Sequence, residues 1–186
     1  AATVINARQA GPAVALAIHF RLPMDQIVES LRHLRQAEMR GRVLHFREGF
    51  TIMDDSYNSN PQALMQMTDT LCRIPAYTRR ILVAGEMLEL GESSAALHYK
   101  CGAWAARRGV NCLAGVGGTA AEIVRGAVEA GLSADQARFF TEVEPAMEFI
   151  DQTVQVGDLV LIKGSRGVHL EQMVQALRSH HAEQTS

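Results

Sequence analysis

The sequence predicts an α/β fold, in which a mostly parallel sheet carries helices on both faces and a short helical segment precedes it. Two observations support this fold class. Short, almost wholly apolar runs at 81–85, 112–118 and 158–165 each end in glycine or serine, and an amphipathic stretch follows each run. Runs of this kind are typical of parallel strands buried on both faces. The 186 residues suffice for one such domain, or for one domain and a fragment of another.

The first fifty residues predict helices and then a hairpin. Short amphipathic helices are expected over 12–20 and over 24 to about 35. The second of these places three aliphatic side chains on one face, namely Ile27, Leu31 and Leu34. The segment GRVLHFREGFTIMDD (41–55) contains two alternating apolar runs around Glu48-Gly49, which predicts a β-hairpin.

Helices and strands then alternate. Pro61 behind Asn60 is typical of a helix start, with the asparagine as N-cap. After the strand at 81–85, a second helix is expected to carry one face formed by Leu97, Cys101, Trp104, Ala105 and Arg108.

A third helix should follow the strand at 112–118. The segment TAAE predicts a capping box with Thr119 as N-cap and Glu122 as its partner, and Gly131 should end the helix. The expected apolar face comprises Ile123, Ala127 and Val128.

The last part of the chain repeats this pattern. ARFF (137–140) predicts a short strand, and a helix is expected from Val143 to about Thr153. After the strand at 158–165, a closing helix should carry an apolar stripe of Leu170, Met173, Val174 and Leu177. HHAEQTS (180–186) is expected to be a frayed tail.

Composition excludes several function classes. The formal net charge is −2, so no basic surface for nucleic acid is expected. No apolar run approaches the roughly 20 residues that span a bilayer, and the opening residues lack a signal-peptide layout. Cys72, Cys101 and Cys112 form no CxxC pair, which favours neither a disulfide framework nor a zinc site. These features predict a cytoplasmic protein without membrane insertion.

Four polar or glycine-rich turns should meet at one edge of the sheet. They are DDSYNSNP (54–61), GEMLELGE (85–92), GVGGTA (115–120) and KGSRGV (163–168). Right-handed crossovers place the turns that follow parallel strands at the carboxyl edge, where open α/β sheets bind ligands. The sequence therefore predicts a binding site there.

DDSYNSNP carries more polar groups than a turn requires. One asparagine as helix cap and one aspartate in an Asx-turn account for only part of the set. We interpret the surplus as a nucleotide pocket, in which a carboxylate accepts ribose hydroxyls and an amide or Tyr57 lies against the base.

KGSRG offers two cations and a close approach to the backbone at a helix N-terminus, which suits a carboxylate or a phosphate. Lys163 is one of only two lysines in the chain, which makes its position informative.

The other two turns are weaker signals. GVGGTA loosely matches a dinucleotide fingerprint, but the expected acidic partner is at best Asp135, which falls in a loop. Glu86, Glu89, Glu92 and His98 make a metal site conceivable, although such side chains more often face water or form ordinary hydrogen bonds. The chain contains no GxxxxGK[ST] segment, so no P-loop is present.

Together, DDSYNSNP, GEMLELGESSAALH and KGSRGVHLEQMVQAL resemble the C-terminal domain of the Mur ligase family. DDSYNSNP is similar to the family pattern DDSYNANP, with Ser59 in place of an alanine, and Glu86 stands where the family usually has aspartate. The resemblance implies a Rossmann-like domain over 41–186, and for 1–40 the C-terminal helices of a central ATPase domain.

The resemblance also implies an activity. Members of this family are ATP-dependent amide ligases of peptidoglycan biosynthesis, and so serve cell wall biogenesis, cell shape and cell division. The pattern matches the member that adds D-alanyl-D-alanine to UDP-N-acetylmuramoyl-tripeptide through an acyl-phosphate intermediate. The chain would be the C-terminal portion of a monomeric enzyme and incomplete for catalysis alone. Magnesium ligands would lie in the central domain, so we assign no metal ligand here.

Site residues follow by the same resemblance. Arg42 and Asp55 would meet ATP, with Asp55 at the ribose, and three further residues would lie near the base, namely Tyr57, Asn58 and Asn60. The incoming dipeptide or the reacting carboxylate would lie near Lys163, Ser165 and Arg166. Lys163 is also the candidate catalytic residue.

Two alternatives remain open from the sequence. The chain could be a module that docks a nucleotide or a partner without chemistry. It could also be an NAD-dependent oxidoreductase domain built on GVGGTA.

Overall fold

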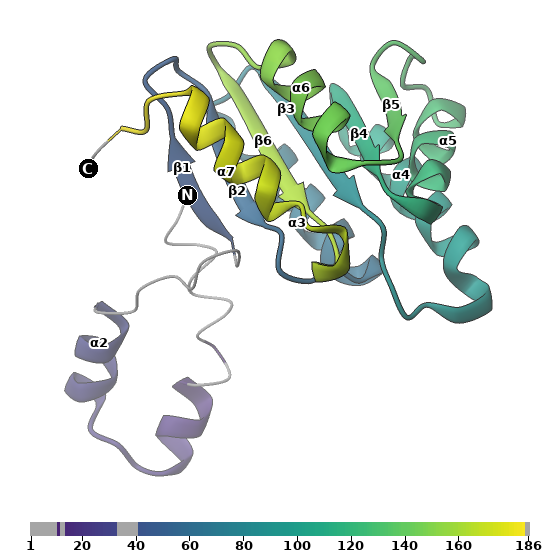
Figure 1. Cartoon of the computed structure of the whole chain (residues 1–186). Coiled ribbons are helices and arrows are strands. Elements are labelled where there is room, and N and C mark those ends of the chain that lie inside the picture. The colour runs from purple at the N-terminus through teal and green to yellow at the C-terminus, as the bar shows by residue number, and fades with distance from the viewer. Residues whose placement is uncertain (1–10, 12–13, 33–40, 185–186) are drawn as a thin grey trace.

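The computed structural model describes residues 11, 14–32 and 41–184, and contains one six-stranded sheet with the strand order β1-β2-β6-β3-β4-β5 (Figure 1). The strands are β1 (Arg42–His45), β2 (Thr51–Asp55), β3 (Arg79–Gly85), β4 (Cys112–Val116), β5 (Ala137–Phe140) and β6 (Asp158–Lys163). β1 pairs with β2 in antiparallel fashion, and every other neighbouring pair is parallel. The predicted hairpin and the mostly parallel sheet are therefore confirmed.

Helices cover both faces of the sheet, as predicted (Figure 1). The helices of the domain are α3 (Pro61–Arg73), α4 (Ser94–Arg108), α5 (Ala121–Glu129), α6 (Val143–Thr153) and α7 (Glu171–His180). The first three pack on one face and the last two on the other. Side chains of β6 alternate between the two hydrophobic cores, because successive residues of a strand point to opposite faces.

Helix α4 packs closely on α5 through two glycines. A Cβ atom at Gly102 would collide with the carbonyl group of Ile123, and one at Gly126 would collide with the carbonyl group of Tyr99. The buried side of α4 includes Cys101 and Ala105, as predicted, but it also includes His98. Leu97 and Trp104 are only half-buried, so the inward face is rotated relative to the prediction.

The helical segment before the sheet comprises residues 14–19 and α2 (Met24–Arg32). Ile27 is buried, as predicted, whereas the predictions for residues 12–13, 33–35 and the Leu31 side chain lie outside what the structure describes. Several large apolar side chains of this segment are exposed, namely Leu16, Ile18, Phe20, Leu22, Met24 and Val28.

Two predictions about α5 are wrong. Thr119 lies in a short 3₁₀ turn, η2 (Gly118–Ala120), and the N-cap of α5 is Ala120, which makes no side-chain capping bond. The capping box does not form because the Thr119 hydroxyl donates instead to the Glu86 carboxylate, at 2.7 Å. Val128 is exposed, although Ile123 and Ala127 are buried as expected.

The predicted frayed tail is also wrong as far as residue 184. The chain after α7 pairs with the end of β1: Glu183 forms a β-bridge with Phe46, and the Gln184 amide donates to the His45 carbonyl oxygen at 2.7 Å. These contacts partly cover an edge strand, whose backbone groups would otherwise be unpaired.

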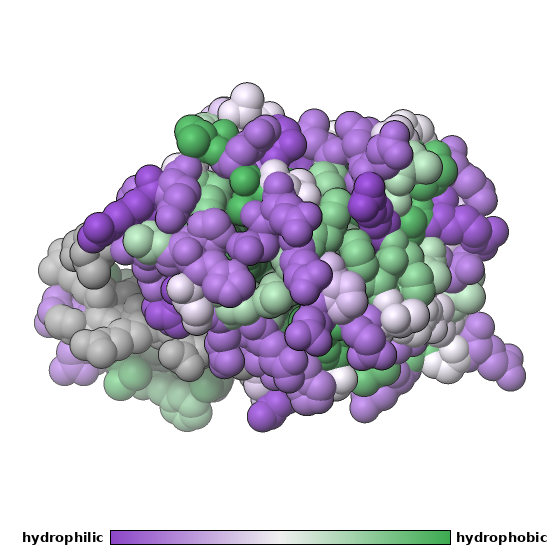
Figure 2. Space-filling model, turned by 45° about the horizontal axis from the view of Figure 1, so that its top comes forward, coloured by the Kyte–Doolittle hydropathy of each residue, from purple (hydrophilic) through white to green (hydrophobic). Residues whose placement is uncertain are grey.

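Hydrophilic residues cover most of the surface in the view of Figure 2, and hydrophobic residues appear among them as separate areas. In the described part of the chain, no helix has the length and apolar character needed to span a membrane.

Candidate functional site at the carboxyl edge of the sheet

The turns after β2, β3, β4 and β6 lie along one edge, because these strands are parallel neighbours. Backbone hydrogen bonds join three of the turns directly. The Glu86 amide donates to the Val116 carbonyl oxygen at 2.9 Å, and the Ser165 amide donates to the Glu86 carbonyl oxygen at 3.2 Å. The predicted convergence of the four turns is thus confirmed.

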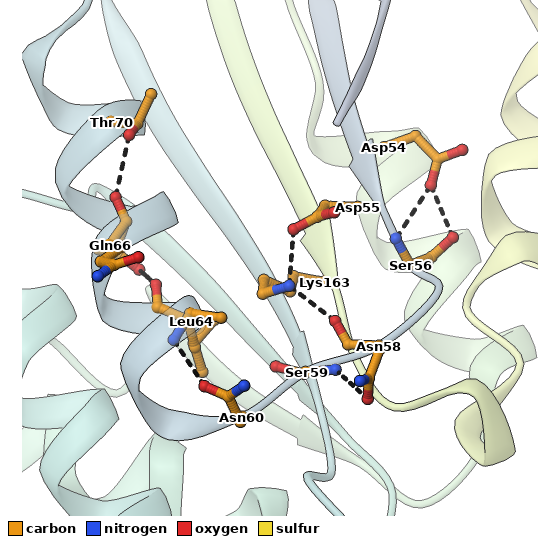
Figure 3. Close-up of polar contacts among 12 residues, drawn as sticks. Asp54, Asp55, Ser56, Asn58, Ser59, Asn60, Leu64, Gln66, Thr70 and Lys163 are labelled. Carbon is orange, nitrogen blue, oxygen red and sulfur yellow. Dashed lines mark hydrogen bonds and ion pairs between the residues drawn. The ribbon is translucent and has the colours of Figure 1, made fainter. Parts of the chain in front are cut away.

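Lys163 is the last residue of β6 and lies at this edge, next to the turn after β2 (Figure 3). Its side chain is only 3% exposed. Nζ donates to Asp55 Oδ2 at 2.6 Å and to the carbonyl oxygen of Asn58 at 2.7 Å. A buried ammonium group requires such partners. DDSYNSNP and KGSRG, which the sequence suggested for two different ligands, therefore form one structural unit.

The two adjacent aspartates have different surroundings. Asp54 and Asp55 point to opposite sides of β2, and only Asp55 faces Lys163 (Figure 3). Asp54 is buried and accepts from the Ser56 amide at 3.2 Å and from the Ser56 hydroxyl at 2.6 Å. Burial raises the pKa of the Asp54 carboxyl group, and the bonds from Ser56 oppose that shift. Asp54 therefore shapes the turn and does not face the site.

Both asparagines of the turn also serve the backbone. Asn60 Oδ1 accepts from the Ala63 amide at 2.8 Å, as the N-cap of α3, and this prediction is confirmed. Asn58 Oδ1 accepts from the Ser59 amide at 2.8 Å. Ser59 itself is buried, and its hydroxyl has no hydrogen-bond partner among the described residues. Asn58 and Asn60 are exposed, so their amide nitrogens remain accessible.

The remaining predicted residues have different surroundings. Arg166 is exposed, and its guanidinium carbon lies 5.5 Å from the centre of the Tyr57 ring, a cation–π contact between the two turns. Ser165 is buried, and its Oγ accepts from the Leu88 amide at 3.0 Å. Arg42 pairs in register with Asp54 and contacts Glu183 at 3.6 Å, so it belongs to the edge strand beside the turn.

The Glu86 side chain occupies the glycine-rich turn after β4. Glu86 Oε1 accepts from the Thr119 amide at 2.9 Å and from the Thr119 hydroxyl at 2.7 Å. A Cβ atom at Gly118 would collide with this carboxylate. The Thr119 amide bond is the main cause of a lowered pKa of Glu86. A dinucleotide phosphate would need this position, so the arrangement counts against the NAD-dependent alternative.

His98 forms hydrogen bonds, as the sequence allowed, but its burial was not predicted. Its ring is fully buried behind the turn after β3, where Nε2 accepts from the Met87 amide at 2.8 Å. The helical spacing of His98, Cys101 and Ala105 on one face of α4 was the available signal.

No group of three or more His, Cys, Asp or Glu side chains in the described ranges is placed to hold a metal ion. Glu89 and Glu92 are exposed. All three cysteines are free thiols, and burial raises the pKa of Cys101 to about 12, which suppresses the reactive thiolate.

A mostly parallel sheet with helices on both faces and a lysine–aspartate pair at its carboxyl edge defines a Rossmann-like α/β domain. More specifically, the chain belongs to the Mur ligase family, since the family described as "Mur ligase, glutamate ligase domain" matches residues 39–166.

Three relatives illustrate the similarity. UDP-N-acetylmuramoyl-tripeptide–D-alanyl-D-alanine ligase of Bacillus subtilis is 30% identical over 92% of this chain and 37% of its own length. A crystal structure of MurF from Acinetobacter baumannii is 25% identical, with a TM-score of 0.78 over 90% of this chain and 36% of that one. MurF from Thermotoga maritima in complex with ADP is 26% identical, with a TM-score of 0.66 over 80% of this chain and 32% of that one. The chain thus spans about a third of the length of each of these three relatives.

Proposed function

We propose that this chain is the C-terminal part of an ATP-dependent ligase that joins D-alanyl-D-alanine to UDP-N-acetylmuramoyl-tripeptide. The names of the relatives support this reaction. The observation that carries the proposal is the Lys163 bridge, which ties DDSYNSNP to KGSRG at one edge of the sheet. One rigid unit then presents both sets of binding groups.

The proposed reaction proceeds in two steps. ATP transfers its γ-phosphoryl group to the terminal carboxylate of the tripeptide, which gives an acyl phosphate and ADP. The amine of D-alanyl-D-alanine then attacks the carbonyl carbon, inorganic phosphate leaves, and the nitrogen loses a proton as the amide forms. Because an acyl phosphate hydrolyses in water, the enzyme must close around it before the amine attacks.

On the nucleotide side, DDSYNSNP offers one open carboxylate oxygen. Asp55 Oδ2 is held by Lys163, whereas Oδ1 accepts no hydrogen bond from the described residues and is oriented by that pair. We infer that Oδ1 accepts a ribose hydroxyl of ATP. The Asn60 side chain uses its oxygen as the helix cap, which leaves its amide hydrogens to donate to the base. Tyr57, Asn58 and Arg42 would complete this side.

On the acceptor side, the KGSRG turn offers donors. An ammonium group carries three hydrogens, and Lys163 uses two of them on Asp55 and Asn58. Ser165 accepts from the Leu88 amide, and its hydroxyl hydrogen has no acceptor among the described residues. We infer that Lys163, Ser165 and Arg166 stabilise the dipeptide carboxylate or the charge that develops on the reacting carbonyl group.

The finer assignments belong to the same proposal. Residues 1–40 would be the last helices of a central ATPase domain, and residues 41–186 the C-terminal domain. Magnesium would be the metal partner of ATP and would be bound by that central domain. We place the enzyme in the cytoplasm as a monomer that serves cell wall synthesis, cell shape and cell division.

Phosphate release by the full-length enzyme that carries this chain tests the proposal. The assay contains ATP, magnesium and UDP-muramoyl-tripeptide, with or without D-alanyl-D-alanine. Release that depends on the dipeptide is the expected result. Nucleotide binding without dipeptide-dependent release would contradict the ligase proposal and favour a docking module.

The nucleotide assignment has its own test. Replacing Asp55 with alanine should raise the KM for ATP, because the oriented carboxylate oxygen is lost. An unchanged KM for ATP would remove Asp55 from the nucleotide site. Glu92→Ala, an exposed carboxylate of the neighbouring turn, is the control and should leave that KM unaltered.

A further inference from the structure

His98 is a buried polar side chain that no proposed substrate contact uses. It lies in the first turns of α4, and its ring is 0% exposed. Burying an imidazole is unfavourable unless both ring nitrogens have partners. Its partners therefore indicate what the residue does.

The hydrogen bonds of His98 define one neutral tautomer. Nδ1 lies 2.8 Å from the carbonyl oxygen of Ser94, which can only accept, so Nδ1 carries the hydrogen. Nε2 lies 2.8 Å from the Met87 amide, which can only donate, so Nε2 is the acceptor. His98 thus connects the start of α4 to the turn after β3.

That turn is connected in the same way to KGSRG. The carbonyl group of Glu86 accepts from the Ser165 amide, and the Leu88 amide donates to the Ser165 hydroxyl oxygen. Met87, between these two residues, donates to His98. Three consecutive residues therefore bond alternately to the Ser165 turn and to α4.

Close packing makes this connection stiff. A Cβ atom at Gly85 would lie 3.1 Å from the Cα atom of Gly164, so the carboxyl ends of strands β3 and β6 are in direct contact. A displacement of the turn after β3 would consequently move Ser165, and with it the nearby residues Lys163 and Arg166 of the same turn.

We propose that His98 is a positioning residue for the acceptor side of the site. It contacts no substrate. Through the Met87 amide, His98 holds the turn after β3 in place. The Leu88 amide of that turn donates to the Ser165 hydroxyl oxygen, which leaves the Ser165 hydroxyl hydrogen available to donate. The expected effect on kinetics rests on the proposed ligase function. The hydrogen-bond coupling between His98 and Ser165 does not depend on that function.

The kinetic test uses the full-length enzyme with ATP, magnesium, UDP-muramoyl-tripeptide and D-alanyl-D-alanine. His98→Leu removes the acceptor, and His98→Gln supplies an amide oxygen in its place. We expect His98→Leu to raise the KM for the dipeptide roughly tenfold or more, since small misplacements of binding groups are costly, with little change in the KM for ATP. His98→Gln should recover most of the loss.

A double-mutant cycle distinguishes positioning from general destabilisation. In a Ser165→Ala background, His98→Leu should have little further effect on the dipeptide KM, because the group that it positions is gone. Thr68→Val is the matched control: Thr68 is also a buried, hydrogen-bonded side chain, but it lies on α3. Additive effects, or a His98→Leu effect no larger than that of Thr68→Val, would overturn the proposal.

A second measurement does not depend on activity. We expect the Leu88 amide hydrogen of this chain to exchange faster in both His98→Leu and Ser165→Ala than in the wild type. His98→Gln and Thr68→Val should leave its exchange rate unchanged. Unchanged exchange at Leu88 in His98→Leu would contradict the coupling. If the wild-type enzyme releases no phosphate in response to the dipeptide, the ligase function fails, and the exchange result still decides whether His98 positions Ser165.

Discussion

The two ends of strand β6 carry charged side chains that are buried in different ways. At its start, Asp158 is fully buried and accepts from Arg79 with both oxygens, at 2.8 Å and 2.6 Å, and from the Gln155 amide at 2.9 Å. The guanidinium group also donates to the carbonyl oxygen of Thr153. Every one of these partners belongs to the scaffold.

At the other end, Lys163 is equally buried but bonds to a turn. Asp55 keeps one oxygen, and Lys163 one hydrogen, without a partner among the described residues. The two pairs differ in how many of their hydrogen-bonding groups the described residues use. The first is saturated by the protein, and the second retains hydrogen-bonding capacity at the surface of the sheet edge.

Breaking the pair at the start of β6 should have the largest effect on stability. Arg79→Met leaves the Asp158 carboxylate buried without its partner, so we expect a loss of about 3–5 kcal/mol in the free energy of unfolding. Urea denaturation of this chain at pH 7 measures it. Arg73→Met is the control, since the Arg73 side chain is 72% exposed and pairs with Asp69 at 4.0 Å, so its loss should cost less than about 1 kcal/mol. Equal losses in the free energy of unfolding for Arg79→Met and Arg73→Met would contradict the structural role of the buried Arg79–Asp158 pair.

Breaking the pair at the end of β6 should affect activity more than stability. Lys163→Met should lower kcat/KM for ligation roughly hundredfold, because the donor and the orientation of Asp55 are both lost. The free energy of unfolding should fall by only about 1–3 kcal/mol, since the Asp55 carboxylate can reach water. The control is Lys100→Met at the exposed second lysine. Full activity of Lys163→Met would remove Lys163 from the site.

Ser59→Ala compares a buried hydroxyl without a partner among the described residues with a hydrogen-bonded one in the same turn, by the free energy of unfolding. The buried Ser59 hydroxyl has no hydrogen-bond partner in the part of the chain that the structure describes, so its removal should raise the free energy of unfolding by about 1 kcal/mol. Ser56→Ala is the control with the opposite expected sign, because the Ser56 hydroxyl donates to Asp54. A loss of stability in both variants would indicate that Ser59 has a partner in solution.

The smallest effect concerns Glu86 and depends on pH. Its pKa is lowered in the folded protein from the ordinary value of 4.5. The stabilisation is therefore present above that value and is lost as the pH falls through the lower, folded-state pKa. Glu86→Gln should flatten the pH dependence of the unfolding free energy below pH 4.5, by less than about 1 kcal/mol because solvent screens the group. Denaturation from pH 7 to pH 3 measures it, with exposed Glu129→Gln as control; identical curves for Glu86→Gln and wild type would contradict this account.

Much of this molecule follows from the sequence alone. Apolar runs, turn residues and helical spacing predicted the hairpin, the parallel strands and the two helical layers. They also predicted that four turns share one edge, because that depends only on alternation of strands and helices. Asn60 as the cap of α3 was likewise a local property, since a cap and its amide partner are three residues apart.

Tertiary structure decided which side chains meet. β2 and β6 are neighbours although more than a hundred residues separate Asp55 from Lys163, and strand order is not encoded in local periodicity. For the same reason two sequence predictions were wrong. The Thr119 hydroxyl donates to the Glu86 carboxylate of another turn, and the tail pairs with the open edge next to β1. Local patterns specify elements because their causes are local, whereas buried polar groups take their partners from whichever elements the packing of the core brings together.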